Sequence, residues 1–384
     1  MSLYHPHACR WCSSAVCTLL PMPDPSILTI GNFDGVHAGH ASLIARARHL
    51  AANRHPGARV VALAFDPSPV TILNPQRVPA RLSTFAQRYR WLTALGASDV
   101  VQLIPTPDLL SLTADEFVAR ARDRFNAVGW VAGPDFRFGK GRGGTMDTIR
   151  AALGQPASVE QAPAVDRALS DHTVVRASST VIRTLVAAGR VHDAWSLLGR
   201  PYQIEGVVVR GDRRGRSIGF PTANIETTQL LPAHGVYSAI AEVVPITSQP
   251  ADSIARLGLV DAATLRVPAA VNVGARPTFP NAPPTLEAHL ILPDPPASID
   301  RDGTIPAWSP IPALRGIEYG WGIRLSFIAH LRDQVRFPAL SALVEQLRRD
   351  VDRARDSVAM ATNGDANMLA RGWNLPTLDP VVPR

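Results

Sequence analysis

The spacing of apolar residues divides the chain into two stretches of different character. In the first stretch, short apolar runs alternate with segments whose apolar residues recur every three or four positions, the period of one helical face. Within residues 41–53, for example, Leu43, Ile44, Ala47 and Leu50 share one face. This pattern predicts strands over residues 27–30, 59–65, 99–104 and 128–133, and helices over residues 41–53, 84–95, 113–125, 179–188 and 192–198.

Strands separated by helices of this length are joined by right-handed crossovers and lie parallel in one sheet. Ligands of such sheets bind at the carboxyl ends of the strands, so the loops that follow strands are the first places to look for a site. The helix over residues 113–125 also has a start signal, because Thr113 and Glu116 have the spacing of a capping box. The first stretch is therefore predicted to be an α/β domain with a parallel sheet.

The pattern changes at residues 199–201. Beyond them, β-like runs follow one another with turns that contain Gly and Pro and with no long helix, which predicts a small antiparallel β-barrel. An amphipathic helix is predicted to close the domain over residues 340–355. The predicted strands cover residues 202–209, 235–243, 269–273, 286–292 and 323–328.

These changes define the expected domain organisation. Two stretches rich in Pro, Asp and Ala, residues 245–264 and 293–316, are predicted to be surface insertions. The expected parts are a flexible leader over residues 1–26, an α/β domain over 27–199, a barrel domain over 200–355 and a loose tail over 356–384.

Composition and charge narrow the classes of protein. The 384 residues are 46% hydrophobic and 18% charged, which is typical of folded domains. No apolar run reaches the roughly 18 residues of a membrane span, so a membrane is not an expected partner. The net charge of +7 rests on 39 basic residues, but only Lys140 is a lysine and the arginines are scattered, so nucleic acid is not expected either. The oligomeric state is left open, a homo-oligomer included.

All three cysteines, Cys9, Cys12 and Cys17, lie in the first 17 residues and cannot cross-link the domains. This predicts a reducing compartment, the cytoplasm. His5 and His7 together with the cysteines have the chemistry of a zinc site, but no second ligand pair follows at finger spacing, which favours a flexible leader. A signal peptide is disfavoured too, because the apolar stretch of the leader is short and its basic flanks are weak.

The first candidate site is the turn between the first predicted strand and helix. Gly31 and Gly39 let the backbone approach a phosphate, and the helix N-terminus adds partial positive charge. His37 and His40 fall on one face of the first helical turn and can donate hydrogen bonds to phosphate oxygens. Such a site suits adenylyl transfer, which needs positioning and charge stabilisation at the α-phosphate. An isolated histidine pair is more often structural, but here strand, glycines and helix coincide.

Residues 31–40, GNFDGVHAGH, resemble the HxGH signature of nucleotidyltransferases, and their NFDG part is similar to the flavin adenylyltransferase family. Segments similar to three more of its motifs follow in order: FDPSP at 65–69, where Ser68 departs from a frequent His, GPDFRFGKG at 133–141 and SSTVIR at 178–183. The resemblance implies a Rossmann-like domain. It implies catalytic roles for His37 and His40, ATP contacts for Gly31, Phe33, Asp34, Gly39, Ser178, Ser179, Thr180 and Arg183, and flavin contacts for Asp66, Pro67, Asp135, Phe136, Arg137 and Phe138.

The most specific stretch of the second half is residues 210–224, RGDRRGRSIGFPTAN. Its three glycines and four arginines can wrap a polyphosphate, although a solvated turn is the alternative. Thr222 and Asn224 offer neutral oxygens on one face of an extended chain, which suit a Mg²⁺ held largely by nucleotide phosphates. Glu287 is flanked by apolar Leu286 and Ala288, so its carboxylate faces away from them and could deprotonate an alcohol that attacks a γ-phosphate. Without further evidence, Glu287 would be interpreted as an exposed strand glutamate with no catalytic role.

These segments resemble the riboflavin kinase family, whose glycine-rich loop and PTAN motif match residues 210–224 almost residue for residue. Gln334 replaces the usual Glu near the end of the barrel, and Glu318-Tyr319 stands where Asp-Leu-Tyr is common. The resemblance implies that Glu287 is the catalytic base, that Thr222 and Asn224 bind metal, that Gly211, Arg214, Gly215 and Gly219 bind ATP, and that Arg332 and Phe337 bind flavin.

The two motif sets cover residues 27–352, and the chain is similar to the bacterial-type bifunctional riboflavin kinase and FAD synthetase family. The resemblance implies that riboflavin and ATP give FMN in the barrel and that FMN and ATP give FAD and pyrophosphate in the first domain. Mg²⁺ is expected with ATP, and flavins are expected as substrate and product. A flavin-binding or regulatory protein without turnover and a kinase with an inactive first domain are the alternatives. Retention of His37, His40, Thr222, Asn224 and Glu287 favours the enzyme.

Overall fold

The computed structural model describes residues 24–154, 158–211, 213–244, 266–274, 285–292 and 318–362. These residues form two compact units, the first ending at Ser179 and the second beginning at Thr180. Helices α7 (Ser179–Ala187) and α8 (Val191–Leu198) therefore group with the barrel, upstream of the predicted boundary at residue 199. The two predicted insertions lie outside the described residues, as do residues 1–23 of the leader.

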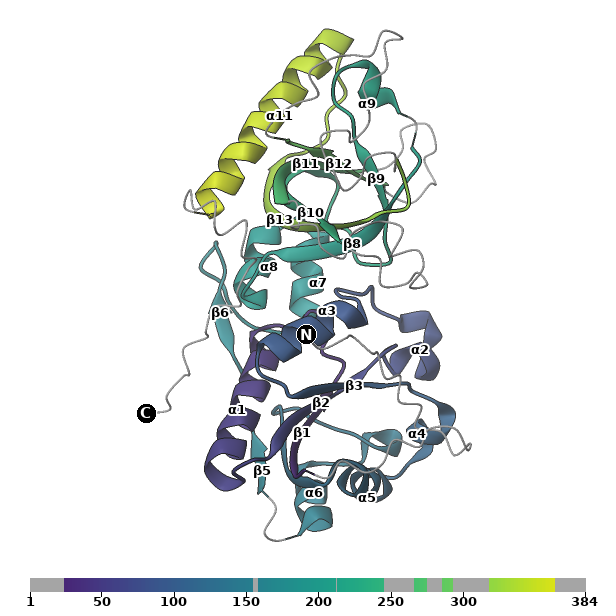
Figure 1. The fold of residues 1–384 in the computed structure, drawn as a ribbon, viewed down its shortest axis with the longest axis vertical. Coiled ribbons are helices and arrows are strands. Elements are labelled where there is room, and N and C mark those ends of the chain that lie inside the picture. The colour runs from purple at the N-terminus through teal and green to yellow at the C-terminus, as the bar shows by residue number, and fades with distance from the viewer. Residues whose placement is uncertain are drawn as a thin grey trace. The chain divides into compact units, whose positions relative to one another are not determined.

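A parallel sheet forms the centre of the first unit, as predicted, but it has five strands, and the strand over Ser158–Gln161 was not predicted (Figure 1). The strand order is β3-β2-β1-β4-β5, so the direction of winding reverses between β1 and β4. In sheets of this kind the crevice for a ligand opens at the carboxyl ends of the strands next to that reversal. The strands are β1 (Ser26–Gly31), β2 (Arg59–Phe65), β3 (Asp99–Leu103), β4 (Ala127–Ala132) and β5 (Ser158–Gln161).

Apolar side chains cover both faces of this sheet. Successive residues of β1 alternate between two clusters, since Ile27 packs with Ile44 and Leu92 on one side and Leu28 packs with Phe117 and Trp130 on the other. The predicted capping box at Thr113 and Glu116 is present. The remaining elements are α1 (Ala38–Arg54), α2 (Val70–Leu73), η1 (Pro75–Arg77), α3 (Phe85–Ala94), α4 (Pro107–Ser111), α5 (Ala114–Phe125), η2 (Lys140–Arg142), α6 (Met146–Leu153) and the hairpin of β6 (Asp166–Ala168) and β7 (Val174–Arg176).

The second unit contains a closed antiparallel barrel in the order β10-β11-β12-β9-β8-β13, which confirms the predicted barrel. Buried and less buried residues alternate along β11 and β12, because one side of each strand faces the barrel core. The strand β9 and the short helix α9 (Arg214–Ser217) were not predicted. The barrel strands are β8 (Tyr202–Val209), β9 (Ala223–Glu226), β10 (Gly235–Val244), β11 (Arg266–Gly274), β12 (Thr285–Leu290) and β13 (Gly322–Arg332).

The last helix, α11 (Leu340–Ala361), runs along the outside of the barrel (Figure 1). The prediction of a loose tail from residue 356 was wrong for residues 356–361, which continue the helix. Val358 explains the extension, because it is buried against Ile240 and Ile328 of the barrel. Residues 363–384 lie outside the described part of the chain.

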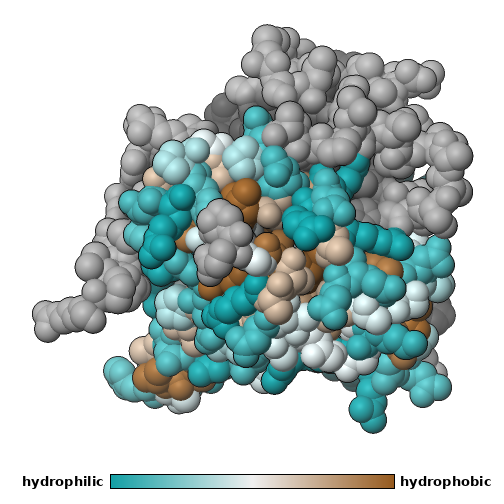
Figure 2. Space-filling view, turned by 90° about the horizontal axis from the view of Figure 1, so that it is seen from below, coloured by the Kyte–Doolittle hydropathy of each residue, from teal (hydrophilic) through white to brown (hydrophobic). Residues whose placement is uncertain are grey.

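Few large apolar side chains are exposed in the described residues. Three of them, Ile72, Leu73 and Val78, belong to the segment between β2 and α3. Figure 2 shows one face of the molecule, where hydrophilic side chains surround small apolar groups. Of the helices in the described segments, none has both the length and the apolar character needed to cross a membrane.

Candidate active sites

The turn after β1 is tightly wound and firmly held. Phe33, Gly35 and Val36 have φ angles of 50°, 81° and 40°, a left-handed region that is strained for a β-branched or bulky residue. The carboxylate of Asp34 accepts hydrogen bonds from the backbone N–H groups of Leu82 and Ser83, both within 3.1 Å. Asp34, predicted to contact ATP, thus uses its carboxylate to stabilise the turn.

The turn brings His37 and His40 together at the start of α1. Nδ1 of His37, the N-cap residue, accepts the N–H of Gly39 at 3.1 Å, and Nδ1 of His40 accepts the N–H of His37 at 3.3 Å. Because each Nδ1 is an acceptor, a neutral imidazole here must carry its proton on Nε2. The two rings stack with centroids 3.8 Å apart. The two stacked rings therefore each carry an Nε2–H donor at the positive end of a helix.

Gly39 and Phe33 lie close to the histidine rings. A Cβ atom at Gly39 would lie 3.1 Å from the ring of His37 and 3.3 Å from the carbonyl oxygen of Ala177, so a side chain there would displace the N-cap histidine. Phe33 is fully buried, and its ring centroid lies 5.0 Å from that of His40. The predicted ATP contact of Phe33 thus cannot come from an exposed ring, whereas Gly31, at the end of β1, has only ordinary contacts.

The SSTVIR segment divides between the two units. Ser179 Oγ donates to the carbonyl of Asp34 at 2.7 Å, so the segment touches the histidine turn at its first residues. Ser178 precedes it, and Thr180 and Arg183 belong to the second unit. The structure therefore brings Ser179 to this site, and the ATP contacts of Thr180 and Arg183 stay predictions.

Arg88 of α3 links two of the loops at the carboxyl edge of the sheet. Its guanidinium is buried and donates to the carbonyls of Asn32 at 2.6 Å and Phe65 at 2.8 Å. It also donates to Asp66 Oδ1 at 2.5 Å. Burial lowers the pKa of Arg88, and the nearby Asp66 opposes that shift. Sequence reasoning missed this residue, although its position beside Trp91 on the buried face of a predicted helix was an available signal.

The carboxylate of Asp66, which was predicted to contact flavin, accepts hydrogen bonds from several side chains. Besides Arg88, Arg81 donates to its Oδ1 at 2.8 Å, and Gln102 donates to its Oδ2 at 3.3 Å. Pro67 follows and is exposed. The carboxylate thus anchors the loop after β2 and leaves the residues beyond it to face a ligand.

The loop after β4 combines an aromatic anchor with exposed polar residues. Phe138 is 8% exposed and packs in the core, and Phe136 stacks on it with centroids 5.3 Å apart. Asp135 and Arg137 are exposed, and Asp135 lies 3.6 Å from Arg176. The three motif loops thus follow β1, β2 and β4, which are neighbours in the sheet.

In the barrel, three polar side chains form a row across adjacent strands. Glu287 of β12 pairs directly with Asn224 of β9 on one side and with Asn272 of β11 on the other. Directly opposite residues share a face, and the burial pattern of β12 puts Leu286 and Ala288 on the other face. This confirms the prediction that Glu287 points away from its apolar neighbours. Gln334 extends the row by donating to Asn272 Oδ1 at 2.8 Å.

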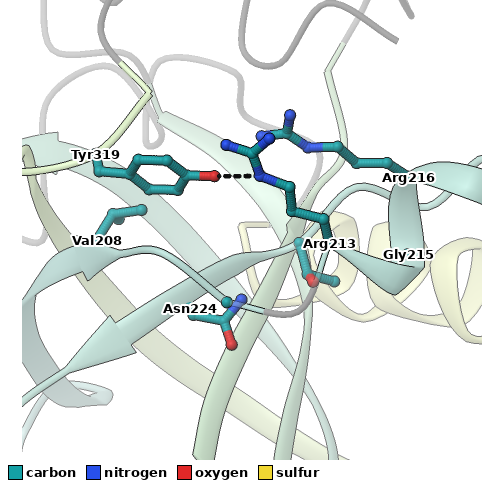
Figure 3. Close-up of a pocket in the computed structure, with 8 residues that line it drawn as sticks. Val208, Arg213, Gly215, Arg216, Asn224 and Tyr319 are labelled. Atoms are coloured by element: carbon teal, nitrogen blue, oxygen red, sulfur yellow. Dashed lines mark hydrogen bonds between the residues drawn. The ribbon is translucent and has the colours of Figure 1, made fainter. Parts of the chain in front are cut away.

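A pocket lies beside this row, and Figure 3 shows the residues that line it. Thr222 and Asn224, the predicted metal ligands, both line it, as do Gly211 and Gly215. A Cβ atom at Gly211 would lie 2.1 Å from Asn224 Nδ2, so only glycine leaves room for the amide. Gly219 has φ 86°, which also favours glycine. Arg214 begins α9, and residue 212 is not described.

Two arginines of the glycine-rich loop bind one carboxylate at this pocket. Arg213 and Arg216 each donate to Glu318 at 2.9 Å. Arg213 also donates to the Tyr319 hydroxyl at 3.0 Å, as Figure 3 shows. The hydrogen bond from Arg216 lowers the pKa of Glu318. Sequence reasoning missed Arg216 and Glu318, which are far apart in the chain. A polyphosphate at this loop would compete with Glu318 for the same cations.

The two predicted flavin residues of the barrel lie near α11. Arg332 binds the buried carboxylate of Asp350 through Nε at 3.0 Å and a terminal nitrogen at 2.6 Å. The ring centroid of Phe337 lies 5.7 Å from the Arg332 guanidinium carbon. Arg332 thus holds α11 to the barrel. Among the described residues, no group of three His, Cys, Asp or Glu side chains could hold a metal ion.

Comparisons with known proteins match both halves of the chain. Residues 20–177 match the family FAD synthetase, and residues 198–358 match the family riboflavin kinase. A bifunctional riboflavin kinase/FMN adenylyltransferase from Escherichia coli (strain K12) is 32% identical over 336 residues, 86% of this chain and 92% of that protein. A protein of the same name from Bacillus subtilis (strain 168) is 29% identical and covers 86% of this chain and 91% of its own length.

The fold is also found in a solved structure. A chain described as a macrolide-efflux protein from Streptococcus pneumoniae superposes with a TM-score of 0.67 and 28% sequence identity, over 87% of this chain and 95% of that one. What the two proteins share is therefore the fold of nearly their whole length.

Proposed function

The chain belongs to the bifunctional riboflavin kinase/FMN adenylyltransferase family, and we propose that it divides the two reactions between its two units. It phosphorylates riboflavin to FMN with ATP, and it adenylylates FMN to FAD with release of pyrophosphate. One observation carries the proposed division: the FAD synthetase match ends at residue 177 and the riboflavin kinase match begins at residue 198, on either side of the division between the units.

We place FMN adenylylation at the histidine turn of the first unit. A phosphate oxygen of FMN attacks the α-phosphorus of ATP, and the bond from that phosphorus to pyrophosphate breaks. The Nε2–H groups of His37 and His40 and the N-terminus of α1 stabilise the negative charge that grows on the α-phosphate oxygens. This needs no covalent intermediate, because positioning and electrostatics supply the rate enhancement.

We assign riboflavin phosphorylation to the row of polar side chains on the barrel. The primary hydroxyl of riboflavin attacks the γ-phosphorus of ATP, Glu287 accepts the hydroxyl proton, and the bond to ADP breaks. Arg213 and Arg216 leave Glu318 to bind the phosphates, next to the backbone of Gly211 and Gly215.

The pocket fits the Mg²⁺ that we expect with ATP. Thr222 and Asn224 both line it and each carries a neutral oxygen, and the close approach of Gly211 to the Asn224 amide restricts that side chain. Two protein oxygens suit a Mg²⁺ whose other ligands are phosphates and water. When bound, the ion would offset the charge of the nucleotide phosphates.

For the flavins, we propose that the loops after β2 and β4 bind FMN through residues beyond their anchors. Pro67, Phe136 and Arg137 are accessible, whereas Asp66 and Phe138 hold the loops in place. On the barrel, Arg332 and Phe337 would close the riboflavin site from the side of α11. We further propose the cytoplasm as the compartment, because all three cysteines lie in the first 17 residues.

Chromatography of the products tests this function. Incubation with riboflavin, ATP and Mg²⁺ should give FMN and then FAD. Recovery of unchanged riboflavin would contradict the enzyme function, and FMN without FAD would indicate an inactive first unit.

A further inference from the structure

The pairing between β9 and β12 ends just before Thr222, one of the two proposed metal ligands. The last pair joins Ala288 to Ala223. Continuation of the register would set Thr222 opposite His289, but Pro221, which comes next, has no N–H to extend the ladder. Thr222 therefore lies where backbone pairing between these two strands has stopped.

A side chain of β12 supplies a hydrogen bond where the backbone pairing ends. Nδ1 of His289 lies 2.8 Å from the carbonyl oxygen of Pro221. A carbonyl can only accept, so Nδ1 carries the proton and donates, and Nε2 is the unprotonated nitrogen of the neutral ring. The ring also packs against Phe220, with centroids 5.4 Å apart. Burial lowers the pKa of His289, which favours the neutral imidazole at neutral pH.

This hydrogen bond controls the orientation of Thr222. The Pro221 carbonyl and the Thr222 nitrogen belong to one planar peptide unit, so holding the oxygen fixes the plane from which Thr222 projects. His289 and Glu287 are two residues apart on β12 and so share one face of the strand. One strand face therefore carries the proposed base and the donor that holds the segment leading to the proposed metal ligands.

We propose that His289 is a positioning residue of the kinase site: by donating Nδ1–H to the Pro221 carbonyl, it holds the Thr222 hydroxyl where it can receive the Mg²⁺–nucleotide complex. The proposal rests on the function proposed for the barrel and deepens it. His289 acts through Pro221 and not on the reacting atoms, so it should govern the affinity for Mg²⁺–nucleotide more than the rate of the chemical step.

Three substitutions separate this role from a merely structural one. His289→Leu removes the donor. In His289→Asn the amide nitrogen can reach the position of Nδ1, whereas in His289→Gln it reaches toward the position of Nε2. The exposed His234 of the same unit provides the control, His234→Asn. Calorimetric titration with Mg·ADP, the nucleotide product of the barrel reaction alone, measures affinity without turnover, and kinase assays over a range of Mg²⁺ concentrations give the half-saturating Mg²⁺.

We expect His289→Leu and His289→Gln to raise the Kd for Mg·ADP and the half-saturating Mg²⁺ by about three- to tenfold, the worth of one neutral hydrogen bond. The kcat at saturating Mg²⁺ should stay within about twofold, His289→Asn should recover most of the affinity, and FAD synthesis from supplied FMN should not change. Equal affinities in wild type and His289→Leu, or an Asn variant as weak as the Gln variant, would overturn the proposal. If Mg·ADP binding followed this order while no protein made FMN, the kinase function would fail and the positioning role would stand.

Discussion

The histidine turn of the first unit and the glycine-rich loop of the second both handle ATP in the proposed function, yet they are held in different ways. The turn after β1 is fastened by Asp34, by the buried Arg88 and by the cap bonds of α1. The loop before β9 is held by Arg213 and Arg216, whose partner Glu318 is itself partly exposed.

This difference has a physical consequence for ligand binding. Buried, multiply bonded groups keep their geometry without a ligand, so the first site is preorganised. Partly exposed ion pairs contribute little to stability and exchange readily with another anion. The kinase loop can therefore release Glu318 for a polyphosphate at small cost, whereas the histidine turn has nothing comparable to release.

The largest expected effect separates the two chemistries at the barrel. Glu287→Gln keeps size and hydrogen bonding but removes the base, so FMN formation should fall by about 10²–10⁴-fold. FAD synthesis from supplied FMN should be nearly unchanged. Initial rates with each substrate measure this, and Glu226→Gln, on an exposed position of the paired strand β9, is the control. Full kinase turnover in Glu287→Gln would move the base elsewhere.

The converse substitution acts on the first unit. His40→Ala removes one of the two Nε2–H donors, and loss of one such donor should reduce FAD formation by about 10²–10³-fold. FMN formation should persist. His49→Ala, an exposed position of the same helix, should leave both rates unchanged. Loss of FMN formation in folded His40→Ala would show that the two sites are not separate.

The rigidity of the first site depends on Arg88. Arg88→Met removes the cation that joins Asn32, Phe65 and Asp66, and breaking such a buried pair costs about 3–5 kcal/mol. Loss of FAD synthesis in urea should therefore shift to lower concentration, while loss of FMN formation should not shift. Arg54→Met, at the exposed end of α1, is the control. Equal shifts of both activities would contradict a role confined to the first unit.

The smallest expected difference between the two sites is in the activity lost by Gly211→Ala and by Gly39→Ala. In Gly211→Ala the new Cβ would lie 2.1 Å from Asn224 Nδ2, so the amide must move and FMN formation should fall by about 10²-fold. In Gly39→Ala the nearest ring atom of His37 is 3.1 Å away, and FAD formation should fall less. Steady-state rates of both reactions decide the order. A milder loss in Gly211→Ala than in Gly39→Ala would count against a metal role for Asn224.

The periodic elements could be predicted from the sequence because their cores are local patterns. β2 was predicted to the residue, and the parallel sheet and the barrel followed from the order of the elements. β9 was missed because only four residues form it, and the end of α11 was missed because Val358 is a single apolar residue beyond a polar run.

The site residues likewise could be predicted only where their contacts are local in the sequence. His37, Gly39 and His40 lie in one turn, so their association is visible in the sequence. Glu318 reaches Arg216 from 102 positions away, and His289 reaches Pro221 from 68 positions away. Such contacts depend on barrel closure and strand register, which no local pattern reports.

Each unit carries one reaction in the proposed function, and a mixture of two variants tests this division most directly. With riboflavin, ATP and Mg²⁺, Glu287→Gln alone should make little FMN and little FAD, and His40→Ala alone should make FMN with little FAD. An equimolar mixture should make FAD, because FMN released by the intact barrel of one variant can enter the intact first unit of the other. A mixture that makes no FAD, although each folded variant retains its single reaction on supplied substrate, would contradict free exchange of FMN between the sites. Loss of both reactions in either folded variant would contradict the division itself.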